Sequence, residues 1–123
     1  MNQRQAFLAK NQTKSIAFRL HMLEILKKTV IKYEKEISTA LLKDLNKNEF
    51  DSYMTEIGMV LSEISFVSKS LKKWAQPKRV KDSMATFGAK GYIYPEPYGQ
   101  VLIIAPWNYP FLLAIGPLIG AIS

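Results

Sequence analysis

The chain has 123 residues, of which 48% are hydrophobic, so it can form one small folded domain and is not expected to be disordered. It contains no cysteine and a single histidine, which excludes disulfide bonds, thiolate metal sites, a histidine-rich metal cluster and a cysteine nucleophile. The formal net charge is +7, but lysines alternate with glutamates along the helical segments, so we expect a solvated basic face and no nucleic-acid partner. The first residues, Met1 to Gln5, lack the apolar core of a signal peptide, and a cytoplasmic location is the default expectation.

Residues 13–45 have the periodicity of an amphipathic helix. Thr13 or Ser15 can cap its start by accepting hydrogen bonds from free N–H groups. Apolar residues then recur every three or four positions, first at Ile16, Leu20, Leu23, Leu26 and Val30 and then at Tyr33, Ile37, Leu41 and Leu45. A bend near Lys32 would divide the stretch into two helices. His21 has no partner of catalytic type nearby, so we expect it at the surface.

The segment from Ser52 to Ala75 has the clearest helical periodicity in the chain, and it follows a turn at Asn46-Lys47-Asn48. Its apolar positions are Ile57, Leu61, Ile64, Val67 or Ser68, Leu71 and Trp74. Gly58 costs about 1 kcal/mol relative to alanine inside a helix, which suggests that another backbone approaches closely there. Glu56 is a candidate acid or base, but at this position on a helix we expect a structural or capping role. Pro77 ends the helix.

The region between residues 78 and 98 is predicted to connect these helices to a short strand. Its composition is polar and irregular from Lys78 to Lys90. The densest basic cluster of the chain lies at the preceding helix end and in this connection, at Lys69, Lys72, Lys73, Lys78, Arg79 and Lys81. Cations at a helix end also suit the helix macrodipole. Tyr92 to Tyr94 are predicted to form a short strand that Pro95 limits to an edge or a bend, and Pro97-Tyr98-Gly99 forms a turn.

Val101 to Ala105 is an uninterrupted apolar run between a polar turn and a proline, which is typical of a strand buried on both faces. Pro106 ends the strand because proline cannot donate to a sheet ladder, and Pro110 is suited to the first turn of a helix. Asn108 is the only strongly polar side chain from Val101 to Ile122. Ligands bind at the carboxyl ends of strands in open α/β sheets, so Asn108 is a candidate site residue.

Two other interpretations stay open. Val101 to Ile122 carries no charge and is long enough to cross a bilayer, which would make the chain a membrane-tethered protein. Three prolines and two glycines in that stretch argue against one continuous helix. The other alternative is a small helical interaction module that uses the apolar stripe of residues 52–75 as its partner surface.

The run from Glu96 to Pro110, which includes GQVLIIAPWNYP, resembles the start of the cofactor domain in NAD(P)-dependent aldehyde dehydrogenases. Tyr109 and the Pro117–Ala121 run look most like the class three branch of that family. The resemblance extends to the family's N-terminal helical layer, through Ala40–Leu45 and Thr55–Ile57.

This resemblance implies an α/β fold in which an N-terminal helical layer precedes the first strand and helix of a truncated Rossmann-like cofactor domain. Residues 1–80 would form the helical segment, residues 81–98 the strand and linker of the oligomerisation arm, and residues 99–123 the start of the dinucleotide-binding domain. In the family, the nucleophilic cysteine and the general base follow later in the sequence. We therefore expect an N-terminal fragment of an aldehyde dehydrogenase that is inactive alone.

The resemblance also implies roles for the Pro-Trp-Asn-Tyr-Pro turn. Asn108 matches the side-chain donor that stabilises the oxyanion during aldehyde oxidation, and its amide offers two N–H donors and no titrating charge. The positions that match the lining of the NAD or NADP site are Ile104, Ala105, Pro106, Trp107 and Asn108. The implied partners of the intact enzyme are an aldehyde, a nicotinamide cofactor and a second copy in a homodimer. Without the resemblance, an asparagine between two prolines would more commonly make an Asx-turn.

Overall fold

The structure is a computed structural model that describes residues 12–81 and 89–123. Its elements in chain order are η1 (Gln12–Lys14), α2 (Ile16–Lys32), α3 (Glu34–Leu45), α4 (Glu49–Ser52), η2 (Tyr53–Ile57), α5 (Gly58–Trp74), β1 (Lys78–Arg79), β2 (Tyr92–Ile93) and α6 (Pro110–Ile122). The first five residues, which bear on the signal peptide, and residues 82–88 of the predicted connection lie outside the described residues. The described chain is therefore mostly helical, with one sheet of two strands.

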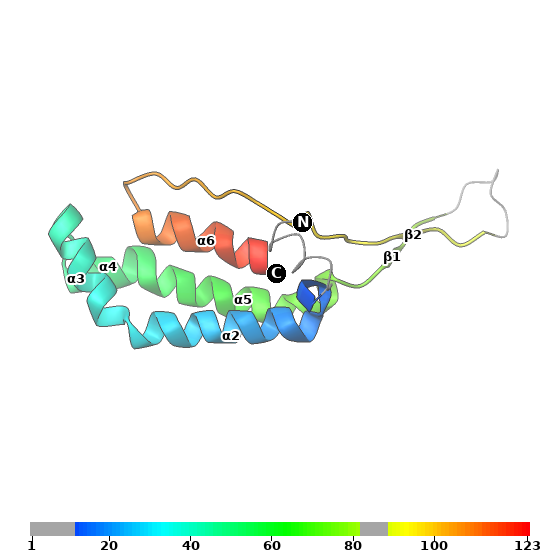
Figure 1. Ribbon diagram of the computed structural model, residues 1–123, viewed down its shortest axis with the longest axis horizontal. Helices are drawn as coiled ribbons and strands as arrows, with labels where there is room; N and C mark the ends of the chain where they lie inside the picture. The colour runs from blue at the N-terminus through cyan, green and yellow to red at the C-terminus, as the bar shows by residue number, and fades with distance from the viewer. Residues whose placement is uncertain (1–11, 82–88) are drawn as a thin grey trace, which may run out of the picture.

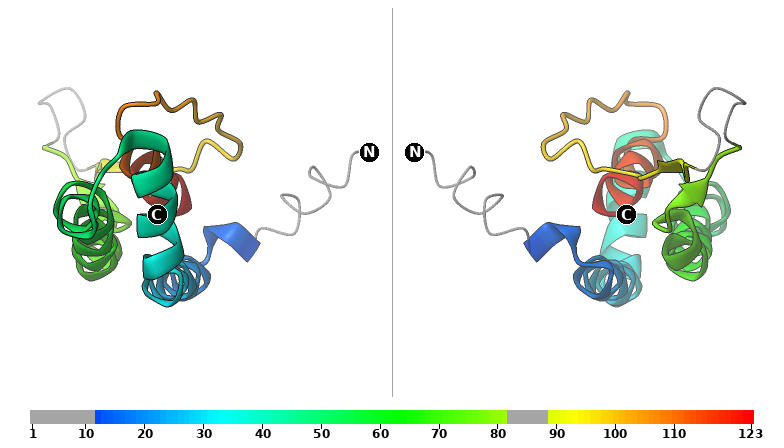
Figure 2. Two further views of the ribbon diagram at one scale, coloured as in Figure 1. Left: turned by 90° about the vertical axis from the view of Figure 1, so that its left-hand side faces the viewer. Right: turned by 90° about the vertical axis from the view of Figure 1, so that its right-hand side faces the viewer.

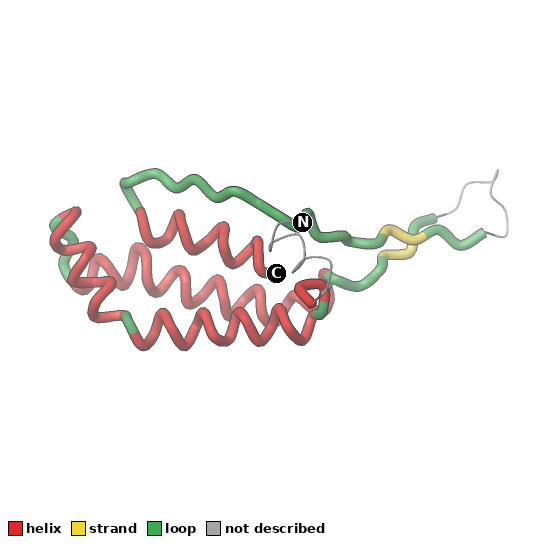
Figure 3. Tube along the Cα trace, viewed as in Figure 1, coloured by secondary structure: helices red, strands yellow, loops and turns green. Residues whose placement is uncertain are grey.

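Helices α2, α5 and α6 lie side by side along the long axis of the molecule (Figure 1). Figure 2 views the molecule along these helices and shows them grouped around a common centre. The short helix α4 and helix α3 lie at one end, whereas β1 and β2 project beyond the helices at the other end (Figure 3). The centre of the fold is thus a layer of helices, and α6 is part of it.

The core confirms the apolar stripes predicted for the long helices. Its buried side chains are Leu23, Val30, Ile57, Val60, Ile64, Val67, Leu71 and Ile119. Three predicted members of the stripes are exposed instead, Tyr33 and Trp74 at 43% each and Leu45 at 37%. Tyr33 lies at the break between α2 and α3, and Trp74 ends α5 and packs edge-on against Phe66, with ring centroids 5.6 Å apart.

The helix boundaries follow the capping signals in the sequence. Ser15 caps α2, and its Oγ accepts a hydrogen bond from the backbone N–H of Phe18 at 3.4 Å. The predicted bend near Lys32 is confirmed, because α2 ends there and α3 begins at Glu34. Asn46 ends α3 in the left-handed conformation, with φ of 54°.

The helix predicted for residues 52–75 is continuous from Glu49 to Trp74, but it widens into a π-turn at η2. The backbone N–H of Gly58 donates to the carbonyl oxygen of Tyr53, five residues earlier. A Cβ atom at position 58 would lie 2.9 Å from that oxygen. The predicted approach of another backbone to Gly58 is not found, because the atoms closest to that position belong to Tyr53 in the preceding turn of the same helix.

The short strand predicted near Tyr92 is confirmed as β2, which pairs with β1 in antiparallel register, Lys78 opposite Ile93 and Arg79 opposite Tyr92. The partner strand β1 was not predicted, because two consecutive charged residues give no alternating pattern. The pairing is extended by one hydrogen bond, from the N–H of Val80 to the carbonyl of Gly91 at 3.0 Å.

The prediction of a buried strand at Val101 to Ala105 is wrong for the described chain. These residues run extended beside α6 but pair with no strand among the described residues (Figure 1). Leu102 and Ile104 are each 84% exposed. A parallel strand is completed by neighbours on its edges and helices on its faces, and the described chain places no second strand beside this one.

The region from Val101 to Ile122 is not one helix, because α6 begins at Pro110, which occupies the first helical turn as predicted. Among residues 12–81 and 89–123, no helix has the length and apolar character needed to cross a membrane.

Candidate functional site

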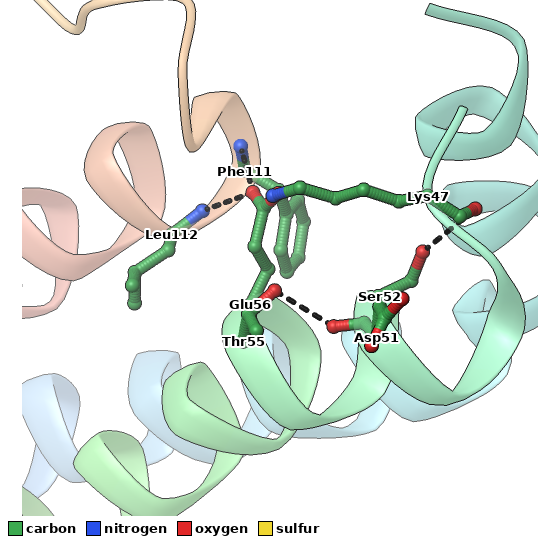
Figure 4. Close-up of polar contacts among 7 residues, drawn as sticks. All are labelled: Lys47, Asp51, Ser52, Thr55, Glu56, Phe111 and Leu112. Carbon is green, nitrogen blue, oxygen red and sulfur yellow. Dashed lines mark hydrogen bonds and ion pairs between the residues drawn. The ribbon is translucent and has the colours of Figure 1, made fainter. Parts of the chain in front are cut away.

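The start of α6 lies directly after the Trp107–Asn108 turn and is bound by a side chain from another helix. The carboxylate of Glu56, in η2, accepts hydrogen bonds from the backbone N–H groups of Phe111 and Leu112 (Figure 4). The N···O distances to Glu56 Oε2 are 2.9 Å and 3.2 Å. A negative charge also complements the positive end of the helix macrodipole. The structural or capping role predicted for Glu56 is confirmed.

All the N–H groups in the first turn of α6 are accounted for. Pro110 has no N–H, Phe111 and Leu112 donate to Glu56, and Leu113 donates to the carbonyl of Tyr109 at 2.9 Å. The N-cap residue, Tyr109, makes no side-chain capping bond. The helix is thus capped from a distance, by a residue 55 positions earlier in the chain.

Glu56 is fully buried, with 0% of its surface exposed, and Lys47 provides the opposite charge. The ammonium of Lys47 lies 2.5 Å from Glu56 Oε1, so both carboxylate oxygens are engaged. The same ammonium lies 4.0 Å from the centroid of the Tyr109 ring, within the range of a cation–π interaction. Lys47 and Glu56 together therefore contact residues on both sides of Pro110.

The backbone around Lys47 is fixed by capping residues. Asn46 ends α3, and Asn48 caps α4, with its Oδ1 accepting from the N–H of Asp51 at 2.8 Å. In the following turn the Thr55 hydroxyl donates to the carbonyl of Asp51 at 2.7 Å (Figure 4). Lys47 is thus held between two helix termini, and its side chain extends toward Glu56.

Asn108 lies in the turn before α6 and is exposed. Its side chain makes no hydrogen bond to any other residue in the described ranges, so the Asx-turn considered for it is not formed there. Both the N–H donors and the oxygen of its carboxamide are free for another molecule. The other predicted cofactor-lining residues precede it directly, at Ile104, Ala105, Pro106 and Trp107.

These residues form one extended, exposed segment. Trp107 is 89% exposed and Ile104 is 84% exposed, whereas Ala105 is half-buried. The backbone groups of residues 101–106 make no hydrogen bond to another described residue. The segment therefore presents apolar side chains, unpaired peptide groups and one carboxamide along a single stretch of chain.

Sequence reasoning identified Glu56 and Asn108 but missed the residues that connect them. Lys47 was noted only as part of a turn, and no local pattern relates it to a residue nine positions later. Arg19 was also missed: its guanidinium donates to the carbonyl of Ser123, and to that of Lys14 at 3.1 Å. His21 is exposed, as predicted. Within the described ranges, no acidic and histidine side chains are grouped to hold a metal ion.

Comparisons with known proteins all point to one family. Residues 3–123 match the aldehyde dehydrogenase family. The chain is 49% identical over 119 residues to the 4,4'-diaponeurosporen-aldehyde dehydrogenase of Staphylococcus aureus, which covers 97% of this chain and 26% of that protein. It is 47% identical to aldehyde dehydrogenase family 3 member A2 of Pongo abelii, over 98% of this chain and 24% of the relative. It is 41% identical to the "dimeric NADP-preferring" aldehyde dehydrogenase of Canis lupus familiaris, over 91% and 25%.

The fold agrees with these matches. A solved structure described as the substrate-bound state of Staphylococcus aureus AldH superposes with a TM-score of 0.93 at 49% sequence identity. The superposition covers 97% of this chain and 26% of that one. The chain thus spans about a quarter of the length of the relatives that it matches.

Proposed function

The chain belongs to the aldehyde dehydrogenase family, and we propose that it forms part of an enzyme that oxidises aldehydes to carboxylic acids with NAD or NADP. In this proposal Asn108 supplies the side-chain donor of the oxyanion hole. The observation that carries it is the free, exposed carboxamide of Asn108 at the start of a helix that a different residue caps.

The proposed role of Asn108 follows from the charge that develops during the reaction. When a nucleophile adds to an aldehyde, negative charge appears on the former carbonyl oxygen. A fixed, neutral N–H donor aimed at that oxygen stabilises the transition state, and removal of such a donor typically lowers kcat by about 10²–10³-fold. The nucleophile must come from outside these 123 residues if it is a cysteine, because the chain contains none.

The segment before Asn108 is proposed to line the cofactor site. The backbone groups of Pro106 and Trp107, which follow the proposed strand, can bind polar groups of a nucleotide, and the side chains of Ile104 and Trp107 offer apolar surface to a flat ring. Ala105 and Pro106 complete the lining. A nicotinamide cofactor bound there supplies the hydride acceptor.

We further propose that residues 1–80 pack as a helical layer against the remainder of the enzyme, and that residues 81–98 belong to an arm used in a homodimer. The projection of β1 and β2 away from the helices supports the second assignment (Figure 3). Residues 99–123 would open a Rossmann-like cofactor domain, in which Val101 to Ala105 gains neighbouring strands. A cytoplasmic location stays a prediction from the sequence.

The test uses a hybrid enzyme, in which this chain replaces the matching segment of the Staphylococcus aureus relative. We expect the hybrid enzyme to form NADH or NADPH with an aldehyde that the parent oxidises, and the 123-residue chain alone to form none. Asn108→Ala should lower kcat by about 10²–10³-fold. The matched control is Gln100→Ala, which removes an exposed carboxamide from the same segment and should leave kcat within a factor of two of the parent hybrid, on the order of assay error.

A hybrid enzyme that folds, binds cofactor and keeps full kcat after Asn108→Ala would contradict the assignment of Asn108. Aldehyde oxidation by the purified chain alone, with contaminating enzyme removed, would contradict the need for the rest of the protein.

A further inference from the structure

Glu56 belongs to the helical layer, yet its carboxylate ends at the turn that carries Asn108. It accepts hydrogen bonds from the N–H groups of Phe111 and Leu112, three and four residues after Asn108. Its partner Lys47 contacts the ring of Tyr109, the residue next to Asn108. A buried ion pair in one part of the fold thus holds the residues that directly follow the turn, in another part.

We propose that Glu56, paired with Lys47, is the positioning residue for Asn108: by capping α6 it fixes the Trp107–Asn108 turn and keeps the Asn108 carboxamide free. This inference rests on the proposed function of Asn108. It assigns Glu56 no contact with substrate or cofactor, and its effect on the reaction passes through the turn.

A second asparagine in the chain makes a capping bond of a kind that Asn108 does not make. Asn48 caps α4, and its Oδ1 accepts from the N–H of Asp51, three residues later. Asn108 and Phe111 have the same spacing. Asn108 lies one residue before the N-cap, Tyr109, so its carboxamide reaches the Phe111 N–H only if the helix start shifts, and Glu56 prevents that shift by holding Phe111 and Leu112. After such a shift the carboxamide would turn back onto the helix and leave the oxyanion position.

The π-turn brings Glu56 to this position. Glu56 lies inside η2, whose closing hydrogen bond runs from Gly58 to Tyr53. A side chain at position 58 would collide with the Tyr53 carbonyl, so the widened turn requires glycine there. Single π-turns inserted into α-helices recur at functional sites because they redirect side chains. The π-turn, which needs Gly58, thus orients the Glu56 carboxylate toward the start of α6.

The test is a double-mutant cycle in the hybrid enzyme with Glu56→Gln and Asn108→Ala. Glu56→Gln preserves the shape of the side chain but removes its charge. We expect it to lower kcat by about 10–100-fold, the order found when a reacting group is misplaced by an ångström or less. In the Asn108→Ala background the same change should lower kcat no further, because the two residues act through one interaction. The matched control is Glu63→Gln, which neutralises an exposed carboxylate on α5 and should leave kcat unchanged.

Two outcomes would overturn the inference: an unchanged kcat in Glu56→Gln, or an equal loss of kcat in both backgrounds, which would indicate a general effect on folding. Full activity of Asn108→Ala alone would instead contradict the proposed function. If Glu56→Gln does not fold, hydrogen exchange on the unaltered hybrid enzyme decides the capping step. The Phe111 and Leu112 amides should exchange far more slowly than the amide of Phe50, which has the same place in the first turn of α4 and no acceptor among the described residues, and equal rates would overturn the proposal.

Discussion

Two of the three lysine–glutamate ion pairs among the described residues share their chemistry and differ in their surroundings. Lys28 and Glu24 lie one helical turn apart on the surface of α2, and Lys28 Nζ is 2.7 Å from Glu24 Oε1. In the second pair, Lys47 Nζ is 2.5 Å from Glu56 Oε1, and the carboxylate is wholly buried. Removal of two charges from water costs several kcal/mol per ion, so a buried pair is weak evidence of a stability gain. The buried charge of Glu56 is better explained by the helix start that it holds.

The exposed pair gives a prediction about pH. The hydrogen bond and the charge of Lys28 hold the pKa of Glu24 below its ordinary value of 4.5. A lowered pKa in the folded state means that the stabilisation is present above the ordinary pKa and is lost as the pH falls through the folded value. Glu24→Gln should therefore slightly lower stability at pH 7 and have no effect in strong acid.

The measurement is the urea midpoint of the hybrid enzyme with and without Glu24→Gln, at pH 7 and at a pH well below 4.5. High salt should reduce the difference at pH 7, because the pair is exposed and screened. Glu63→Gln, on an exposed carboxylate with no ion pair among the described residues, is the control. If the difference in urea midpoint between the parent and Glu24→Gln grew as the pH fell, the predicted direction of the pH dependence would be wrong.

At the scale of the element, η2 reverses the usual effect of a glycine-to-alanine change in a helix. Alanine is favoured over glycine by about 1 kcal/mol in an ordinary helix interior. At position 58 the added Cβ would lie 2.9 Å from the Tyr53 carbonyl oxygen and 3.1 Å from its ring. We expect Gly58→Ala to destabilise the hybrid enzyme by a net of about 1–2 kcal/mol and to lower kcat as Glu56→Gln does.

Thermal unfolding and steady-state kinetics of the hybrid enzyme test this expectation. Ser62→Ala, an exposed position one turn later in α5, is the matched control and should be neutral or slightly stabilising. If Gly58→Ala raised the unfolding temperature and left kcat unchanged, the π-turn would have no part in aiming Glu56.

The helices could be predicted from the sequence because their signals are local. The stripe from Ile16 to Val30, the cap at Ser15 and the break at Asn46 each depend on residues within a turn or two. The run from Val101 to Ala105 has an equally clear pattern, but a strand is completed by partners elsewhere in a fold. Pattern alone therefore predicted the extended backbone and not its pairing.

The candidate site, too, could be predicted from the sequence only in part. Asn108 was identified because it is the only strongly polar side chain from Val101 to Ile122 and matches the family's oxyanion donor, and Glu56 was considered within the family-like run Thr55–Ile57. That Glu56 reaches the start of α6, three residues after Asn108, depends on a contact across 55 residues and on a widened turn. Neither has a periodic signature, although Gly58 marked the place where the helix departs from regular winding.

At the scale of the whole molecule, much apolar surface is uncovered between residues 98 and 107. The exposed side chains include Tyr98 at 96%, Trp107 at 89%, and Leu102 and Ile104 at 84% each. By contrast Phe111, Leu112, Ile115 and Leu118 are half-buried, the first three against the core. Exposed apolar patches of more than a few hundred Å² usually indicate a missing partner or a tendency to aggregate.

We therefore expect the isolated 123-residue chain to be molten or aggregated, and to become ordered only with the rest of an aldehyde dehydrogenase. Calorimetry and amide NMR at micromolar concentration test this, with the hybrid enzyme as the ordered reference. A sharp cooperative melt of a monomer with dispersed amide signals would show that the exposed segment does not limit folding.

The contact between Glu56 and α6 also has a consequence for the order of folding. It closes a loop of 55 residues, and closure of a flexible loop of that length costs about 3.5 kcal/mol in chain entropy. Helices α2 and α5 need no such closure to form their own turns, and the buried carboxylate exists only once they have packed. We therefore expect the turn that carries Asn108 to become ordered after α2 and α5 have formed their own helical turns. A polypeptide whose first helices are misassembled would have no organised oxyanion donor, so catalytic competence would itself report that the helical layer has folded.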